Sequence, residues 1–164
     1  MNIILAPKSY VDAQTFNKFS VYGFNPDTES APEQVSNING IPAASFKAGE
    51  DRELLMETDW AQRIDIPISL EYYMDSEQSA QKISLQIAYS FDGATFVWMN
   101  AENIDAPSDK AIHTTTFANP IPVSAIPTGD GHTLRIKIRR VGSSKTDTHS
   151  GGFCLTAVKY YRAA

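Results

Sequence analysis

Cysteine is almost absent from this chain, which has one, Cys154, in 164 residues. A single thiol excludes an internal disulfide framework and a zinc site made of several cysteines. Long apolar runs are also missing: none approaches the roughly 18 residues that a membrane span needs. No stretch keeps a helical hydrophobic stripe for more than about ten residues, which favours strands over helices. We therefore expect no membrane partner and little helix.

Positive charge is scarce. Lysine and arginine number 14 against 19 aspartates and glutamates, for a net charge of −5. Nucleic-acid binding requires a basic face, so we expect no nucleic-acid partner. The basic residues that do cluster are Arg135, Lys137, Arg139 and Arg140. They form either a solvated outer face that prevents edge-to-edge aggregation or a contact for an acidic partner surface.

Groups for catalysis or metal binding do not gather in the sequence. The three histidines, His113, His132 and His149, share no short spacing with another ligand type. There is no Gly-x-Ser-x-Gly nucleophile motif and no glycine-rich phosphate loop. Several carboxylates lie between residues 51 and 71, where we expect solvated side chains and not the facing pair of a glycosidase. The sequence thus predicts no catalytic residue, no metal ligand, no cofactor and no enzymatic activity.

Strict alternation of apolar and polar residues is the main pattern that is present. It is clear in Ile64–Tyr72, Ile83–Tyr89 and Leu134–Arg139, and it is typical of strands with one buried and one wet face. Residues 100–112 are polar and predict a loop. Further strands are expected over Leu54–Trp60, Phe96–Met99, His113–Phe117 and Phe153–Tyr161. These patterns predict an all-β fold: a single antiparallel β-sandwich, jelly-roll-like, of about eight strands.

The first 45 residues differ from the rest in composition and in hydrophobic pattern. We expect residues 1–45 to form an irregular N-terminal segment with one or two short strands, and residues 46–164 to form the sandwich. The polar run Asn25–Asn39 predicts an extended loop. Aromatic residues precede it, and they indicate either a first strand on the sandwich or an arm that docks onto a partner. These docking candidates are Phe16, Phe19, Tyr22 and Phe24.

The segment Tyr89–Phe96 predicts a hairpin. Its Asp92-Gly93 pair supplies a tight turn, and Phe96 returns as the partner strand. It resembles the Tyr-Ser-x-Asp-Gly-x-x-Trp hairpin of discoidin-type sugar- and lipid-binding sandwiches, with Phe96 at the tryptophan position. A carbohydrate-recognition module would use exposed aromatic rings as stacking platforms; core packing is the competing role for the same rings. The candidate platforms are Tyr72, Tyr73 and Trp98.

A longer likeness covers about 120 residues. From Ala44 onward the chain resembles β-sandwich proteins of tailed-phage and prophage structural gene clusters. The likeness begins with an acid-rich turn after a phenylalanine, followed by a long strand, a polar turn and another strand. Its end has a Leu-Arg-x-x-x-x-Arg strand, an Asp-Thr loop, a small residue with glycine and a final valine-rich strand. In this chain these are Phe46–Glu53, Ile64–Tyr89, Leu134-Arg135, Asp147-Thr148, Gly151-Gly152 and Leu155–Val158. Departing from that pattern, Ile83–Tyr89 holds no tryptophan.

The resemblance implies a non-enzymatic virion structural protein of the head-decoration, fibre-base or tail-associated kind. Such a protein would act in particle assembly through subunit contacts, with other virion proteins as partners and a homotrimer as the favoured oligomer. It would reside in the virion after assembly in the cytoplasm of the bacterial host. The alternative is a discoidin-like carbohydrate-binding module, with a glycan as ligand and host attachment as a role.

Overall fold

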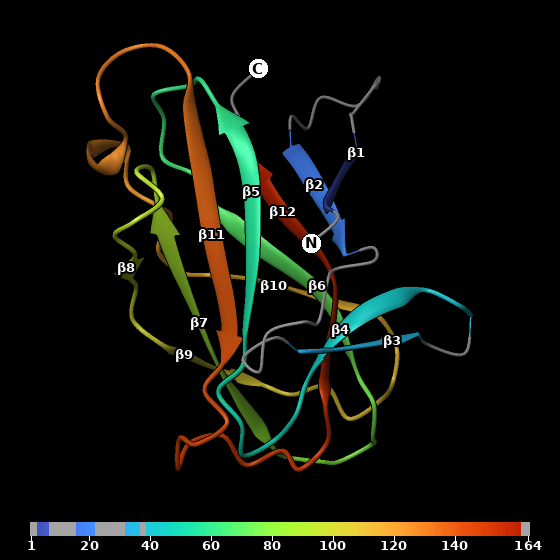
Figure 1. Ribbon diagram of the computed structural model, residues 1–164. Helices are drawn as coiled ribbons and strands as arrows, with labels where there is room; N and C mark the ends of the chain where they lie inside the picture. The colour runs from blue at the N-terminus through green and yellow to red at the C-terminus, as the bar shows by residue number, and fades with distance from the viewer. Residues whose placement is uncertain (1–2, 7–15, 22–31, 37–38, 162–164) are drawn as a thin grey trace.

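The computed structural model describes residues 3–6, 16–21, 32–36 and 39–161, and within these ranges the regular secondary structure is almost entirely β (Figure 1). The single helical element in this part of the chain is one 3-10 turn, η1 (Val123–Ala125). No helix in it is long and apolar enough to cross a membrane. The strands are β1 (Ile3–Ala6), β2 (Phe16–Val21), β3 (Glu33–Ser36), β4 (Pro42–Phe46), β5 (Glu53–Trp60), β6 (Ile68–Met74), β7 (Lys82–Ser90), β8 (Val97–Trp98), β9 (Glu102–Asp105), β10 (His113–Thr116), β11 (His132–Arg140) and β12 (Phe153–Tyr161).

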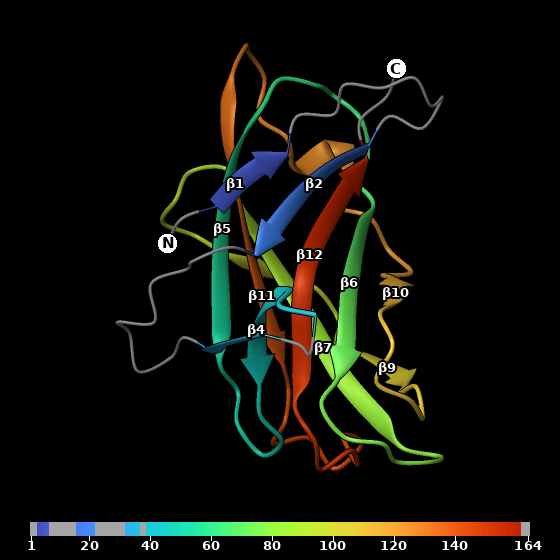
Figure 2. The same cartoon turned by 90° about the vertical axis from the view of Figure 1, so that its right-hand side faces the viewer.

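The larger sheet has β12 at its centre, as Figure 2 shows. On one side β12 pairs along its length with β6, and β10 forms the edge beyond β6. On its other side β12 pairs with two strands in turn: β4 near Phe153 and β2 near Tyr161. β3 extends the sheet beyond β4, and β1 extends it beyond β2. All these pairings are antiparallel.

The smaller sheet has the order β5-β11-β7-β8, with β9 also paired to β7 (Figure 1). Its central strand β11 follows the predicted alternation, since Leu134, Ile136 and Ile138 are buried and the basic residues between them are partly exposed. The buried faces of the two sheets meet in one hydrophobic core. An all-β, jelly-roll-like antiparallel sandwich is therefore confirmed.

Three local expectations were wrong. Residues Glu102–Asp105, expected in a loop, form the edge strand β9, whose single apolar residue Ile104 gave too weak a pattern. Residues Glu33–Ser36, within a predicted loop, form β3. Arg140 does not belong to the exposed basic face: it is in phase with Ile136 and Ile138 and is fully buried.

The N-terminal strands β1 and β2 join the larger sheet through their backbone, as the predicted first strand would. The side chains of Phe16 and Phe19 on β2 lie outside the described structure, as do residues Tyr22 and Phe24 entirely. Docking of these four aromatics onto a partner stays a prediction.

Candidate functional site

A groove of about 460 Å³ lies on the outer face of the larger sheet, and we call it the sheet groove. Its floor is made by three neighbouring strands, since Cys154 on β12 is in register with Ser45 on β4 and with Tyr73 on β6. Alternation places these three side chains outward, while their chain neighbours face the core. The full lining is Val35, Asn39, Ser45, Tyr73, Met74, Asp75, Lys110, Ala111, Ile112 and Cys154.

The wall beside β10 is built by residues 110–112. Asp109 fixes this segment, because its Oδ1 accepts hydrogen bonds from the Ala111 amide at 2.9 Å and from His113 Nε2 at 2.7 Å. The His113 hydrogen bond lowers the pKa of Asp109. Ile112 is 41% exposed, so this wall offers apolar surface. Lys110 adds a positive charge at the rim.

The end of the groove is formed by Asp75, just after β6. Its Oδ1 accepts a hydrogen bond from the Gly152 amide at 2.7 Å, and its own amide donates to the Gly152 carbonyl at 3.1 Å. A Cβ at Gly152 would lie 2.7 Å from Asp75 Oδ2 and 3.0 Å from Ser45 Oγ. A side chain at this position would press on Asp75, whose hydrogen bonds with Gly152 tie β12 to the end of β6.

The floor of the groove is uncharged at neutral pH. Burial, with the neighbouring Cys154 and Asp75, raises the pKa of Tyr73. Burial raises the pKa of the Cys154 thiol to about 11. Neither group is therefore ready to act as a nucleophile or base. No group of three or more metal-ligating side chains occurs among the residues the structure describes.

A pocket of this size, with apolar walls and a few polar groups at its rim, is suited to binding a small ligand or part of a polymer. The hydrogen-bonding side chains are contributed by Asn39, Ser45, Asp75 and Lys110. Val35 and Ile112 supply apolar surface beside them. The arrangement brings hydrogen-bonding side chains and apolar surface together in one hollow.

The three predicted stacking residues do not come together. Tyr73 lies in the sheet groove, although it is only 6% exposed. Tyr72 is 3% exposed and packs against Phe153 in the core, with ring centroids 4.7 Å apart, so its burial argues against a stacking role. Trp98 lies on the smaller sheet, paired to β7 at Ala88.

Trp98 is half-buried and already has a cation on its ring: the Arg139 guanidinium lies 4.0 Å from the ring centroid. Gln86 fixes that guanidinium by accepting from Arg139 Nε at 3.0 Å and Nη2 at 2.6 Å. Lys137 covers Phe96 in the same way at 4.3 Å. The basic face of β11 is thus engaged by its own aromatic neighbours and by nearby carboxylates.

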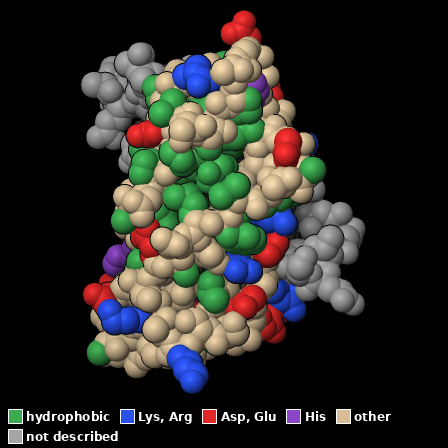
Figure 3. All heavy atoms as spheres, turned by 90° about the vertical axis from the view of Figure 1, so that its left-hand side faces the viewer, with side chains coloured by type: hydrophobic (Ala, Val, Ile, Leu, Met, Phe, Trp, Pro, Cys, Tyr) green, Lys and Arg blue, Asp and Glu red, His purple; other side chains and the backbone are tan. Residues whose placement is uncertain are grey.

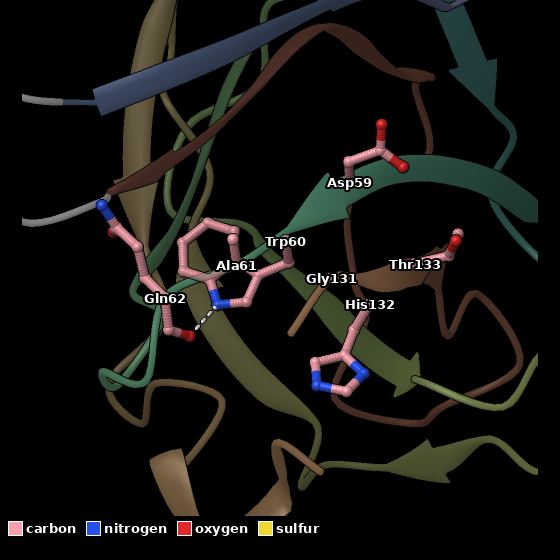
Figure 4. Close-up of a pocket in the computed structure, with 7 residues that line it drawn as sticks. All are labelled: Asp59, Trp60, Ala61, Gln62, Gly131, His132 and Thr133. Atoms are coloured by element: carbon pink, nitrogen blue, oxygen red, sulfur yellow. Dashed lines mark hydrogen bonds between the residues drawn. The ribbon is translucent and has the colours of Figure 1, made fainter. Parts of the chain in front are cut away.

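A second hollow, of about 420 Å³, lies where β5 ends and β11 begins (Figure 4). Its side chains diverge: Asp59 and Thr133 point to one side of the strands, and Trp60 and His132 to the other. The Trp60 indole donates to the Gln62 carbonyl at 2.6 Å, and its ring packs against Tyr160. These contacts give Trp60 a structural role, so we do not place the ligand here.

Apolar side chains face outward near β8, and we call this area the edge patch: Phe91, Val97, Ala125 and Pro127. Figure 3 shows hydrophobic side chains gathered on this side of the molecule. Val97 is 49% exposed and borders a hollow of about 420 Å³ with Phe91, Ala125 and Pro127. The hollow is also lined by Ser90, Asp92 and Thr95, and Asp92 and Ser90 are bonded to each other within their turn. The exposed apolar side chain of Val97 suits contact with another apolar surface.

The predicted Asp92-Gly93 turn is present. Asp92 Oδ1 accepts hydrogen bonds from the Ala94 and Thr95 amides, both at 2.8 Å, and from Ser90 Oγ at 2.9 Å. These bonds lower the pKa of Asp92 to about 2. Gly93 has a φ of 76°, as the tight turn requires. All of these Asp92 bonds are local, and they shape the hairpin.

Comparison with known proteins places the fold alone. No family model matches the chain, and no curated protein sequence matches it. Isomalto-dextranase of Arthrobacter globiformis T6, complexed with panose, is similar with a TM-score of 0.58 and 12% identity over 89% of this chain. The match spans 23% of that enzyme's length, so this chain corresponds to a small part of it.

Two other solved structures are similar at lower scores. The xylan-binding module CBM15 matches with a TM-score of 0.48 and 15% identity, over 99% of both chains. The structure of infectious bursal disease virus, Gx strain, matches with a TM-score of 0.40 and 12% identity, over 94% of this chain and 39% of that one.

Proposed function

We propose that this protein is a non-catalytic carbohydrate-binding module whose ligand lies in the sheet groove. The observation that carries the proposal is the groove itself: apolar side chains and hydrogen-bonding groups border one hollow of about 460 Å³ on the outer face of the larger sheet. Sugar rings combine C–H faces with hydroxyl groups, so they need apolar surface and polar partners side by side. The groove offers both. In the hollow between β5 and β11 the side chains diverge, and in the hollow beside β8 the polar groups Ser90 and Asp92 are bonded within their own turn.

Two further points support a binding role over catalysis. The pKa values of Tyr73 and Cys154 are raised, so both groups are neutral at physiological pH. The polar side chains that line the groove come from separate segments of the chain, and Asp75 is held by the Gly152 amide. Recognition through fixed neutral and charged groups requires no proton transfer.

The test is affinity for glycans, measured by calorimetry after a first screen on a glycan array. The screen begins with soluble α-glucans, because the similar isomalto-dextranase is complexed with panose, and it includes xylans and galactans. Ile112→Asp places a charge on the exposed wall of the groove and should reduce affinity at least about tenfold. Val97→Asp is the matched control: Val97 is similarly exposed but lies outside the groove, so affinity should be unchanged.

A second candidate function is assembly into a virion, and the edge patch favours it. A structural subunit would cover Val97 and its neighbours with another copy or another virion protein. The chain would then form a closed oligomer, with a trimer as our first expectation. Light scattering coupled to gel filtration measures this directly: an oligomer that Val97→Asp dissociates supports assembly, and a monomer at all concentrations contradicts it.

A further inference from the structure

The loop that leads into β12 is held by one buried arginine. Arg140, the last residue of β11, donates from Nε and Nη2 to the two carboxylate oxygens of Asp147 at 2.8 and 2.6 Å. It also donates from Nη1 to the Gly151 carbonyl at 2.5 Å and from Nη2 to the His149 carbonyl. Residues 147–151 are therefore wrapped around a fixed positive charge.

His149 is buried in this loop, at 1% exposed. Its Nδ1 accepts a hydrogen bond from the Gly151 amide at 3.0 Å. A neutral ring that accepts at Nδ1 carries its hydrogen at Nε2, and this Nε2 has no hydrogen-bond partner within the described structure. Burial and the charge of Arg140 lower the pKa of His149. The geometry therefore requires an unprotonated Nδ1.

The loop is continuous with the end of the sheet groove. Gly152, next to Gly151, donates its amide hydrogen to Asp75 Oδ1, and Asp75 lines the groove. The packing around Gly151 is equally tight, because a Cβ there would lie 2.0 Å from Ser76 Oγ and 2.6 Å from Asp75 Oδ1. Gly152, which directly follows residues 149–151 and donates to Asp75, is thus the link through which a movement of those residues would reach the groove.

We propose that His149 is a pH-sensitive switch that controls the shape of the sheet groove; as a control on ligand binding, it rests on the proposed function. Protonation puts a hydrogen on Nδ1, which then faces the Gly151 amide hydrogen and can no longer accept it. It also adds a positive charge beside Arg140. The 149–152 loop then shifts, and Asp75 loses its bond from Gly152.

The charged groups around His149 shift its pKa in opposite directions. Arg140, from β11, opposes protonation, whereas Asp75, after β6, and Asp147, in the loop, favour it. Asp147 is already engaged by Arg140 and by the Ser84 amide at 3.0 Å, and Asp75 is exposed to solvent. Burial is the largest effect and lowers the pKa. The groove is thus intact at neutral pH, and the switch operates below the ordinary histidine value of about 6.5.

His113 provides the matched control. It also borders the groove, through Asp109 and the 110–112 wall, but it is partly exposed and its Nε2 has the Asp109 carboxylate as a partner. Unlike His149, His113 thus has a carboxylate partner at its Nε2. Comparing His113→Asn with His149→Asn therefore separates the effects of the two histidines. In His149→Asn the side-chain oxygen of the introduced amide would keep an acceptor near the position of Nδ1 without titrating.

The experiment follows the amide signals of Asp75, Gly151 and Gly152 by nuclear magnetic resonance between about pH 8 and pH 5, without ligand. In the native protein and in His113→Asn, the three signals should move with one common midpoint below 6.5. In His149→Asn this transition should be absent. Signals of Asp75 and Gly152 that stay still in the native protein, or that move equally in His149→Asn, would overturn the proposal.

Long-range ¹⁵N spectra of the native protein give a second measurement that needs no variant. They should show His149 at neutral pH as the tautomer with hydrogen on Nε2; hydrogen on Nδ1 would overturn the switch. If the amide transition appears but no glycan binds at any pH, the proposed function fails and the switch stands. If a glycan binds with the same affinity above and below the midpoint, the switch fails as a control on binding.

Discussion

Arg140 and Asp147 form a two-bond ion pair with side chains that are 0% and 1% exposed. The pair joins the last residue of the central strand of one sheet to the loop that enters the central strand of the other. Its remaining hydrogen bonds go to backbone carbonyls and to the Ser84 amide. Each charge is therefore satisfied, and removal of either leaves the other buried and unpaired.

Asp147→Asn should destabilise the fold by about 3–5 kcal/mol, because Arg140 would keep its charge without a counter-ion. Urea unfolding followed by circular dichroism measures the change. Asp105→Asn is the control, since the Lys82–Asp105 pair is largely exposed and contributes about 0–1 kcal/mol. Equal losses in the two variants would contradict the structural role assigned to Arg140.

The burial of Arg140 could have been predicted only in part. Alternation along β11 places residue 140 in phase with Ile138, but the cluster of basic residues around it suggested one solvated face. Nothing in the sequence indicates that Asp147 packs against Arg140, because the loop between them shows no hydrophobic periodicity. Edge strand β9 was missed for a similar reason: its contacts with β7, and not its own pattern, make it a strand.

Gly93→Ala should cost more stability than Gly49→Ala. Both glycines have a φ near +76°, so the left-handed backbone destabilises both variants by about 1–2 kcal/mol. At Gly93 the new Cβ would also lie 1.8 Å from Arg135 Nη1, whereas nothing lies within 4 Å at Gly49. Arg135 must move and loses its 2.6 Å contact with Glu57, which adds under about 1 kcal/mol. Thermal unfolding compares the two, and a smaller loss at Gly93 would contradict the turn geometry.

The Cys154 thiol should resist modification in the folded protein. Its pKa is raised to about 11, so only about one thiol in 10⁴ is ionised at pH 7, and the side chain is buried. Ellman's reagent should react with the native chain slowly, and at once after unfolding in urea. Rapid reaction of the native protein would show that the floor of the sheet groove is more open than the structure has it.

The Asp92 turn should lose its hydrogen bonds only in strong acid. The pKa of Asp92 is lowered by its bonds from Thr95, Ala94 and Ser90, so the turn is stabilised above the ordinary aspartate value and loses that stability as pH falls through about 2. Carboxyl ¹³C shifts measure the titration, and the amide shifts of Ala94 and Thr95 should follow the same curve. A midpoint near the ordinary aspartate value of about 4 would contradict these bonds.

The sandwich was predictable from sequence because alternation in β6, β7 and β11 is a local property. The sheet groove was not, although the adjacent aromatics Tyr72 and Tyr73 make Tyr73 a candidate for sugar stacking. Its walls come from β3, from residues 110–112 and from the end of β6, which adopt this arrangement only after the larger sheet forms. The exposed Ile112, in a polar loop, was the one sequence signal that could have pointed to it.

The most direct test of a carbohydrate-binding groove is to map ligand contacts on the native chain. ¹⁵N-labelled protein would be titrated with the oligosaccharides selected by the glycan array, and the amide shifts followed. We predict saturable changes centred on Ser45, Asp75, Ala111 and Ile112, with Val97 and Phe91 unaffected. Changes centred on the edge patch, or no changes with any oligosaccharide at millimolar concentration, would contradict the account.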